Sequence, residues 1–212
     1  MTRVLLTGFE PFGGDAGNPS GDAVRLLAAS WDGPAELITA VLPVTFADAP
    51  AGIRSLIDEH EPDIVIATGL AGNRAAVTPE RVAINLIDAR IPDNAGSRPI
   101  DEPVVKGGPA AYFATIPVKA IARDISAAGI PGEVSFTAGT FVCNQVFYAA
   151  MDAASALPRT RAGFIHVPWS TEHAPAGAPA LPLEDIARAL EIAVRTSIRS
   201  SRDAAIPGGA VS

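Results

Sequence analysis

Asp63-Ile-Val-Ile-Ala-Thr68 is a short apolar run between polar residues, and runs of this kind decide the fold class. Such a run favours a strand buried on both faces of a sheet. Five further runs share this character, and we expect strands at residues 3–7, 35–42, 83–87, 132–137 and 163–167. Helical patterns separate the runs, at residues 20–29, 47–59, 118–128, 144–154 and 183–199. This alternation predicts an α/β fold, in which helices cover both faces of a mixed, largely parallel sheet.

The length and composition are typical of one domain. The 212 residues can bury a substantial core without disulfides or metals. We therefore expect a single α/β domain over residues 1–212, with a frayed tail of small residues at 204–212. Residues 91–117 interrupt the alternation, because they are rich in Pro, Gly, Asp and Asn and show no clear element. A loop of this length in a compact domain is more often functional than idle.

Charge and hydropathy argue against two classes of partner. The formal net charge is −7 at pH 7, whereas nucleic-acid binding calls for clustered Lys and Arg. The sequence contains no uninterrupted apolar run long enough to span a membrane. The apolar run in residues 1–8 is too short for a signal peptide, and one cysteine cannot form an intrachain disulfide. We therefore expect a cytoplasmic protein that binds neither nucleic acid nor membrane.

Cys143 is the only cysteine, and it lies in Gly139-Thr-Phe-Val-Cys-Asn-Gln145, where a turn-forming segment gives way to a helical pattern. A helix that begins near residue 144 would point its free N–H groups and the positive end of its dipole at the sulfur, which favours the thiolate. The thiolate is the form that attacks carbonyl carbons. Because a lone cysteine is often only a small buried apolar residue, a catalytic role requires a nearby base.

A histidine is the usual base for such a thiol, and a third polar group then fixes its orientation. Of the three histidines, His60 lies at a polar helix end and is expected to be solvated, and His173 lies in a loop. His166 ends an apolar strand pattern, and catalytic groups in open α/β sheets gather at the carboxyl ends of strands. His166 is therefore the preferred base, with a structural core histidine as the alternative.

The acid that would orient this histidine is not decided by spacing. Glu80 stands just before an apolar strand pattern, and Glu10, Asp88 and Asp93 are rivals. A metallopeptidase has little support, because the chain has no His-Glu-x-x-His motif and no Cys/His cluster with ligand spacing. We expect neither a metal nor another cofactor.

Four stretches of the chain carry a family resemblance. They read Leu6-Thr-Gly-Phe-Glu-Pro-Phe-Gly-Gly14 with Asn18-Pro-Ser20, Glu80-Arg-Val-Ala-Ile-Asn-Leu-Ile-Asp-Ala-Arg-Ile-Pro-Asp-Asn94, Gly139-Thr-Phe-Val-Cys-Asn-Gln-Val-Phe-Tyr148 and Gly163-Phe-Ile-His-Val-Pro168. In this order and at these spacings they resemble the pyroglutamyl peptidase I, or pyrrolidone-carboxylate peptidase, family. Its members are cysteine peptidases that remove an N-terminal pyroglutamate (5-oxoproline). The resemblance implies this activity, a single catalytic domain, and a three-layer α/β/α sandwich of the phosphorylase/hydrolase-like type.

Carried over position by position, the resemblance implies a catalytic triad of Glu80, Cys143 and His166. His166 would deprotonate Cys143, or hold it as a thiolate–imidazolium pair, while Glu80 fixes the tautomer of the imidazole. The backbone N–H of Cys143 is a natural donor to the oxyanion, and the family suggests Arg90 as a second donor. Water would then hydrolyse the thioester.

The resemblance also implies a pocket for the lactam ring. Its residues are Phe9, Phe12, Asn18, Leu70, Phe141 and Val142. An apolar slot accepts a neutral lactam, whereas burying a charged amino terminus there costs several kcal/mol without a counter-ion. Leu70 departs from the pattern, because many family members have glutamine at this point.

Two alternatives to a pyroglutamyl peptidase remain open at this stage. Leu70 suggests a thiol amidase or acyltransferase that acts on another small acyl group. A pyroglutamate-binding protein that has lost turnover is the non-enzyme alternative. The resemblance further implies a homo-oligomer, a tetramer, although no sequence feature establishes one.

Overall fold

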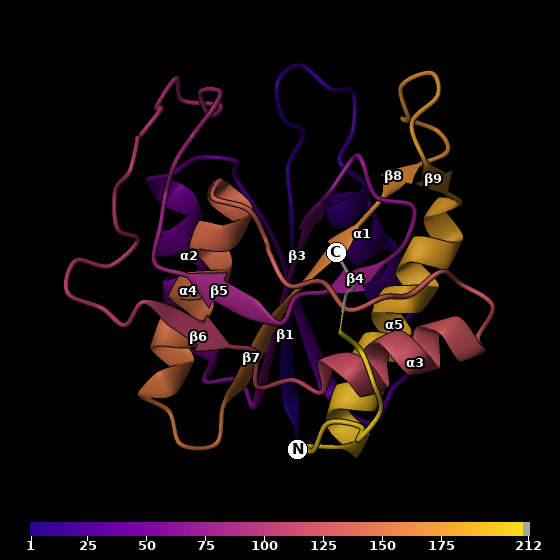
Figure 1. Cartoon of the computed structure of the whole chain (residues 1–212). Coiled ribbons are helices and arrows are strands. Elements are labelled where there is room, and N and C mark those ends of the chain that lie inside the picture. Colours follow the sequence, from indigo (N-terminus) through magenta and orange to yellow (C-terminus); the bar gives the residue numbers. More distant parts are fainter. Residues whose placement is uncertain (210–212) are drawn as a thin grey trace.

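The computed structural model describes residues 1–209, and a five-stranded sheet forms their centre (Figure 1). The strands lie in the order β2-β1-β3-β7-β4. Their bounds are β1 Arg3–Phe9, β2 Glu36–Leu42, β3 Ile64–Leu70, β4 Thr78–Pro79 and β7 Arg161–Val167. The pairs β1–β2, β1–β3 and β3–β7 are parallel, whereas β4 is antiparallel to β7. The predicted mixed, largely parallel sheet is therefore confirmed.

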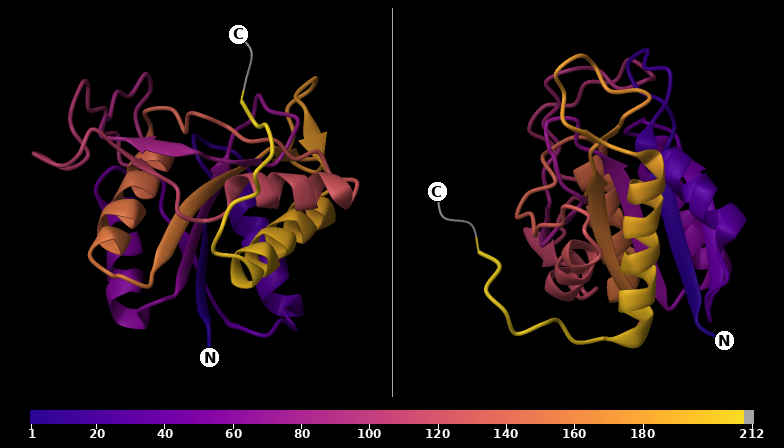
Figure 2. Two further views of the ribbon diagram at one scale, coloured as in Figure 1. Left: turned by 60° about the horizontal axis from the view of Figure 1, so that its bottom comes forward. Right: turned by 90° about the vertical axis from the view of Figure 1, so that its right-hand side faces the viewer.

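Helices cover both faces of this sheet, as the α/β/α expectation requires (Figure 2). They are α1 Pro19–Ser30, α2 Asp48–His60, α3 Val118–Ala127, α4 Val142–Ser155 and α5 Leu183–Arg199. Helices α2 and α4 pack together on one face, and α1 and α5 pack together on the other, with α3 beside α5. No helix within residues 1–209 is long and apolar enough to cross a membrane.

The core follows directly from the apolar patterns. On β3, every side chain from Ile64 to Ala67 is fully buried, because helices lie on both sides of the sheet. On α5, Ile186, Leu190 and Val194 recur at helical spacing and are also fully buried. One hydrophobic cluster extends from Val4 to Val194.

The loops that follow the parallel strands gather at one end of the sheet, drawn at the top of Figure 1. Asn94 joins two of them to the long 91–117 stretch: its Nδ2 donates to the Pro11 carbonyl at 2.9 Å, and its backbone N–H donates to the Val44 carbonyl at 3.0 Å. Asp93 adds a hydrogen bond from the Phe46 N–H at 2.7 Å. The long stretch thus fixes the loops around the end of the sheet where a site is expected.

The predicted strand at residues 132–137 is wrong, although this segment does pair beside β4. Only isolated parallel bridges form, between Val77 and Gly132 and between Glu80 and Ser135. Backbone hydrogen bonds run on either side of Pro79, including Glu133 N–H to the Val77 carbonyl at 3.2 Å. Pro79 has no N–H to donate, so the ladder lacks the bond that would make it continuous.

The short strands also differ from the sequence-based expectation. The strand expected at 83–87 is β5, Val82–Ile84, and it pairs with β6, Ala111–Phe113, rather than with the central sheet. Strand β6 lies inside the stretch 91–117, in which no element was expected. Two further short strands, β8 Trp169–Ser170 and β9 Ala180–Leu181, pair after β7. Short strands carry too few residues for a periodic pattern to reveal them.

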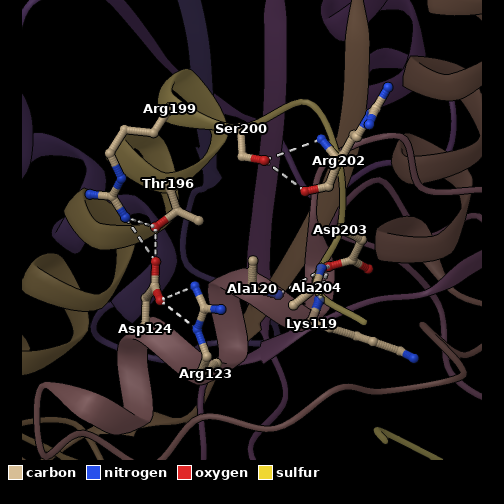
Figure 3. Close-up of polar contacts among 10 residues, drawn as sticks. All are labelled: Lys119, Ala120, Arg123, Asp124, Thr196, Arg199, Ser200, Arg202, Asp203 and Ala204. Carbon is tan, nitrogen blue, oxygen red and sulfur yellow. Dashed lines mark hydrogen bonds and ion pairs between the residues drawn. The ribbon is translucent and has the colours of Figure 1, made fainter. Parts of the chain in front are cut away.

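The segment after α5 returns to α3 and makes polar contacts with it (Figure 3). The N-cap of α3 is Pro117, which offers no capping side chain. Asp203 supplies the cap instead, because its Oδ1 accepts from the N–H groups of Lys119 at 2.9 Å and Ala120 at 3.0 Å. Lys119 Nζ also donates to the Ile206 carbonyl at 2.9 Å. Of the tail expected to fray at 204–212, Ile206 thus contacts α3, and residues 210–212 lie outside the described residues.

Candidate active site

A buried carboxylate and an imidazole form the first part of the site. Strand β4 runs antiparallel to β7 with Thr78 opposite His166, and the Glu80 N–H donates to the Phe164 carbonyl at 2.9 Å. Glu80 lies two residues beyond Thr78 and therefore faces the same side of the sheet as His166. The His166 Nδ1 lies 2.7 Å from Glu80 Oε1, and the two side chains are 5% and 0% exposed. This contact fixes the orientation of the ring.

The rival carboxylates serve other purposes in the structure. Glu10 Oε1 accepts from the Val44 N–H at 3.3 Å. The Asp93 carboxylate accepts from backbone N–H groups in its own loop and in the loop after β2. Asp88 is exposed at the surface. Of the four candidates within residues 1–209, only Glu80 contacts His166.

The other two histidines lie away from this pair. His60 ends α2, where its nearest acid is the exposed Glu59 at 4.0 Å. The His173 Nδ1 lies 3.3 Å from Ser170 Oγ and 4.0 Å from an Asp22 carboxylate oxygen. Within residues 1–209, no group of three or more His, Cys, Asp or Glu side chains could hold a metal ion.

The thiol of Cys143 reaches the same face of the sheet from α4. Gly69 on β3 is in register with His166 on β7, so a side chain at either position faces the same side. A Cβ atom placed on Gly69 would lie 2.7 Å from Cys143 Sγ. The sulfur therefore occupies the space that a side chain at position 69 would fill, on the same face of the sheet as His166 and one strand away. This glycine was not singled out from the sequence for this purpose.

Electrostatics favour the first of the two expected arrangements, in which His166 deprotonates Cys143, over a resting thiolate–imidazolium pair. Burial, and secondly the negative charge of Glu80, raise the pKa of Cys143 to about 12. Burial also lowers the pKa of His166, although Glu80 opposes this effect. The pKa of Glu80 is lowered because His166, Ser135 and Arg74 together outweigh its desolvation, which acts in the opposite direction. At neutral pH these shifts favour a neutral thiol, a neutral imidazole and an ionised carboxylate.

The first turn of α4 offers backbone N–H groups to the space around the thiol. The helix begins at Val142, two residues earlier than expected, and its N-cap Phe141 makes no side-chain capping bond. The first intrahelical bond runs from the Gln145 N–H to the Phe141 carbonyl at 3.1 Å. The N–H of Cys143 precedes this bond and has no partner within the helix. An anion beside the thiol would meet this group and the positive end of the helix dipole.

Arg90, the second oxyanion donor implied by the resemblance, lies on the surface. It is exposed, and among residues 1–209 it makes no side-chain hydrogen bond or ion pair. Its segment does run beside the loop that leads to Cys143, because the Asp88 N–H donates to the Thr140 carbonyl at 3.0 Å and Thr140 Oγ1 donates to the Asp88 carbonyl at 2.8 Å. The role of Arg90 stays a prediction.

A pocket of about 90 Å³ opens beside the thiol. Its lining is Phe9, Phe12, Asp15, Asn18, Val44, Leu70, Phe141, Val142 and Cys143. All the residues that the resemblance implied for substrate binding therefore lie together around one space. Val44 and Asp15 were missed, since nothing in their local sequence distinguishes them from other loop residues.

The pocket wall is held by aromatic packing and by a helix cap. The ring of Phe141 packs against Phe12 and Phe46, with centroid distances of 5.4 Å and 5.0 Å. The Asn18 Oδ1 accepts from both the N–H and the hydroxyl of Ser20, at 3.1 Å and 2.8 Å. Asn18 therefore caps α1 while it lines the pocket, so its oxygen already has partners.

Two polar residues next to the thiol anchor the start of α4. The Asn144 amide accepts from the Ile84 N–H at 3.0 Å and donates to the carbonyls of Ile84 and Leu86 at 2.9 Å and 3.0 Å. Gln145 Nε2 donates to the Phe46 carbonyl at 3.0 Å. Sequence reasoning assigned these residues no role. Their polarity at buried helical positions was the available indication.

An open α/β sheet with a thiol, an imidazole and a carboxylate at the carboxyl ends of its strands is the arrangement of a cysteine hydrolase. Comparison with known proteins narrows this class. The chain belongs to the pyroglutamyl peptidase family, whose model matches residues 2–200. The predicted resemblance is thus confirmed.

Individual relatives match over almost the whole chain. A pyrrolidone-carboxylate peptidase of Clavibacter michiganensis subsp. michiganensis is 49% identical over 212 residues, which is 100% of both chains. The crystal structure of pyroglutamyl peptidase I from Bacillus amyloliquefaciens superposes with a TM-score of 0.93 at 47% identity, covering 97% of this chain and 99% of that one. A mutant pyrrolidone carboxyl peptidase from Pyrococcus furiosus gives 0.89 at 38% identity, covering 93% and 99%.

Proposed function

We propose that this protein is a cysteine exopeptidase that removes an N-terminal pyroglutamate from peptides. One arrangement carries the proposal: Cys143 lines a small apolar pocket, and its sulfur lies above Gly69, the β3 residue in register with His166, whose imidazole lies 2.7 Å from the buried Glu80 carboxylate. Family membership supports the same activity. The pocket supplies the place for the ring, and the triad supplies the chemistry.

In the proposed acylation step, Cys143 Sγ attacks the pyroglutamyl carbonyl carbon as its proton passes to His166 Nε2. A carbon–sulfur bond forms, the carbonyl oxygen takes the negative charge, and Glu80 accepts a hydrogen bond from the Nδ1–H of the imidazolium. His166 then returns the proton to the amine as the carbon–nitrogen bond breaks. Because the resting thiol is neutral, proton transfer accompanies the attack instead of preceding it.

Deacylation uses the same groups, with a water molecule as the attacking group and the Cys143 sulfur as the leaving group. His166 takes a proton from a water molecule, whose oxygen attacks the thioester carbon, and returns it to sulfur as free pyroglutamate leaves. In both steps the oxyanion is assigned to the uncapped start of α4, with the Cys143 N–H as the first donor. Arg90 is the proposed second donor, and substrate would have to draw its side chain inward.

Selectivity follows from the composition of the pocket. Phe9, Phe12 and Phe141 provide apolar walls that suit a flat neutral ring. An unblocked amino terminus would bring an ammonium group into this space, at a cost of several kcal/mol. Leu70 makes one more wall apolar, so polar contacts to the lactam are assigned to backbone groups and to the remaining N–H of the Asn18 amide.

The activity is tested with three anilide substrates. We expect chromophore release from a pyroglutamyl anilide and none from the prolyl or glutaminyl anilide. The prolyl compound is the sharpest comparison, because it keeps the five-membered ring but replaces the neutral lactam by a charged amine. Efficient turnover of the prolyl compound, or of another acyl group in place of pyroglutamyl, would favour the thiol amidase alternative.

The nucleophile is tested by Cys143→Ser, which keeps the shape of the side chain. We expect kcat/KM for the pyroglutamyl anilide to fall by about 10³-fold or more, with an unchanged melting temperature. Normal turnover by this variant refutes the mechanism. Binding of pyroglutamate by a wild-type protein that cannot turn over the anilide identifies the non-catalytic alternative instead.

We also propose that the protein is a homotetramer and that it is located in the cytoplasm. Exposed apolar side chains such as Phe113 and Ile100, which are 66% and 61% exposed, are compatible with a contact between copies. Light scattering on the purified protein should give four times the mass of one chain, and a monomer mass would remove the tetramer from the proposal.

A further inference from the structure

Arg74 lies behind the triad, on the loop that follows β3. Its Nη1 lies 2.6 Å from Glu80 Oε1 and 2.6 Å from Thr78 Oγ1, and its Nη2 donates to the Thr137 carbonyl at 2.9 Å. The side chain is 24% exposed, whereas Glu80 is fully buried. One guanidinium thus joins the loop after β3, the end of β4 and the segment that leads to the nucleophile.

The oxygen that Arg74 contacts is the same one that orients His166. Glu80 Oε1 lies 2.7 Å from His166 Nδ1 and 2.6 Å from Arg74 Nη1. A fully buried carboxylate is costly unless it is paired with a cation and hydrogen bonded. Since the resting imidazole is neutral, Arg74 is the cation that balances Glu80 before substrate binds.

We propose that Arg74 is a positioning residue for the reaction: its guanidinium holds Glu80 ionised and aimed at His166, and ties this pair to the loop that carries Cys143. The expected effect of Arg74 on turnover rests on the proposed function. The hydrogen bond to the Thr137 carbonyl ties Arg74 to the loop that carries Cys143, because residues 137–141 lead directly into the first turn of α4.

The charge of Arg74 acts on every titrating member of the site in one direction. It lowers the pKa of Glu80, of His166 and of Cys143. Among residues 1–209, the charged groups that act on this cluster are these three and Arg74 itself, from the end of β4, from β7, from α4 and from the loop after β3. Removing the cation should therefore move the whole pH dependence upward, which the loss of a purely structural contact would not do.

The variant to make is Arg74→Met, which removes the charge and keeps an apolar stem. We expect the acid limb of the kcat/KM profile for the pyroglutamyl anilide to move up by about one pH unit, a loss of about tenfold below that limb. Arg81→Met is the matched control, because Arg81 is next to Glu80 in sequence but pairs with Asp203 and lies over Phe113. The control should keep the wild-type profile.

A second readout does not depend on peptidase activity. Cys143 is the only thiol, so alkylation by iodoacetamide reports on it alone. Between about pH 7 and pH 10 we expect Arg74→Met to be alkylated about tenfold more slowly than wild type and than Arg81→Met. If the wild-type protein failed to cleave the anilide, the proposed function would fail, while this alkylation rate would still decide the role of Arg74.

Arg74→Lys separates charge from geometry and serves if the methionine variant does not fold. One ammonium group keeps the charge but cannot replace both arms of the guanidinium fork. We expect an unchanged acid limb with a kcat below that of Arg81→Lys. Wild-type kcat in Arg74→Lys, or an Arg74→Met variant that matches Arg81→Met in both its pH profile and its alkylation rate, overturns the proposal.

Discussion

At the scale of single residues, the site requires that position 69 carries no side chain. Gly69 stands in register with His166, and a methyl group there would lie 2.7 Å from Cys143 Sγ and 2.9 Å from Phe164 Cζ. Real Cβ atoms do not approach other atoms so closely, so the thiol or the Phe164 ring would have to move. We therefore expect Gly69→Ala to lower kcat/KM by about tenfold or more, at a cost of about 1–3 kcal/mol in stability.

Gly52→Ala makes the same chemical change in α2, where the new Cβ would meet only the flexible Leu42 side chain at 3.2 Å. This control should keep wild-type activity, and helix propensity favours alanine there. The pair is compared in the anilide assay and by thermal melting. Full activity in Gly69→Ala would show that the sulfur does not need the space above this glycine.

At the scale of secondary structure elements, Asn144 fixes α4 against β5, and with it the position of Cys143. In Asn144→Asp the carboxylate keeps the Ile84 N–H bond but faces two carbonyl oxygens that lose their donor. A negative charge near a helix N-terminus gains about 0.3–1 kcal/mol, whereas unpaired buried polar groups cost about 1–3 kcal/mol each. The cost is larger than the gain, so we expect Asn144→Asp to lower the free energy of unfolding, measured in urea, by about 2–4 kcal/mol. We also expect a lower kcat/KM.

Ser155→Ala, at the opposite end of the same helix, removes only an exposed bond to the Asp152 carbonyl. Its stability should stay within about 0.5 kcal/mol of wild type. An Asn144→Asp variant as stable as Ser155→Ala would mean that the amide does not hold the helix.

Some secondary structure elements could be predicted from the sequence and others could not. Helices such as α5 were predictable because their apolar spacing persists over several turns, and the expected bounds at 183–199 match the observed element. The segment at 132–137 was not, because one missing donor at Pro79 interrupts its ladder. Local patterns also placed Cys143 and His166 at element ends, where catalytic groups are expected.

Pairings between distant segments set the remaining limits. Whether Glu80 or a rival acid faces His166 depends on the β4–β7 register, which local patterns do not contain. Gly69 and Arg74 gain their roles from the same non-local geometry, through the β3–β7 register and the contact with Glu80. Only the family resemblance singled out Glu80 among the acids in advance.

At the scale of the whole molecule, the buried site makes the folded protein lose stability at both acid and alkaline pH. Burial lowers the pKa of His166 below 6.5, so the unfolded chain takes up a proton that the folded one does not as the pH falls through 6.5. The lowered pKa of Glu80 adds a second loss below 4.5. Conversely, the pKa of Cys143 rises from 9.0 to about 12, so stability falls as the unfolded chain ionises above pH 9.0.

We therefore expect a plateau of melting temperature between about pH 7 and pH 9, with an alkaline decline of at most about 1.4 kcal/mol per pH unit from the thiol. Cys143→Ala should remove this decline between about pH 9 and pH 10. Above pH 10 the raised pKa values of Tyr112 and Tyr148 add their own losses in both proteins. An identical decline in wild type and Cys143→Ala would mean that the thiol ionises in the folded protein as readily as in the unfolded chain, so that burial does not raise its pKa.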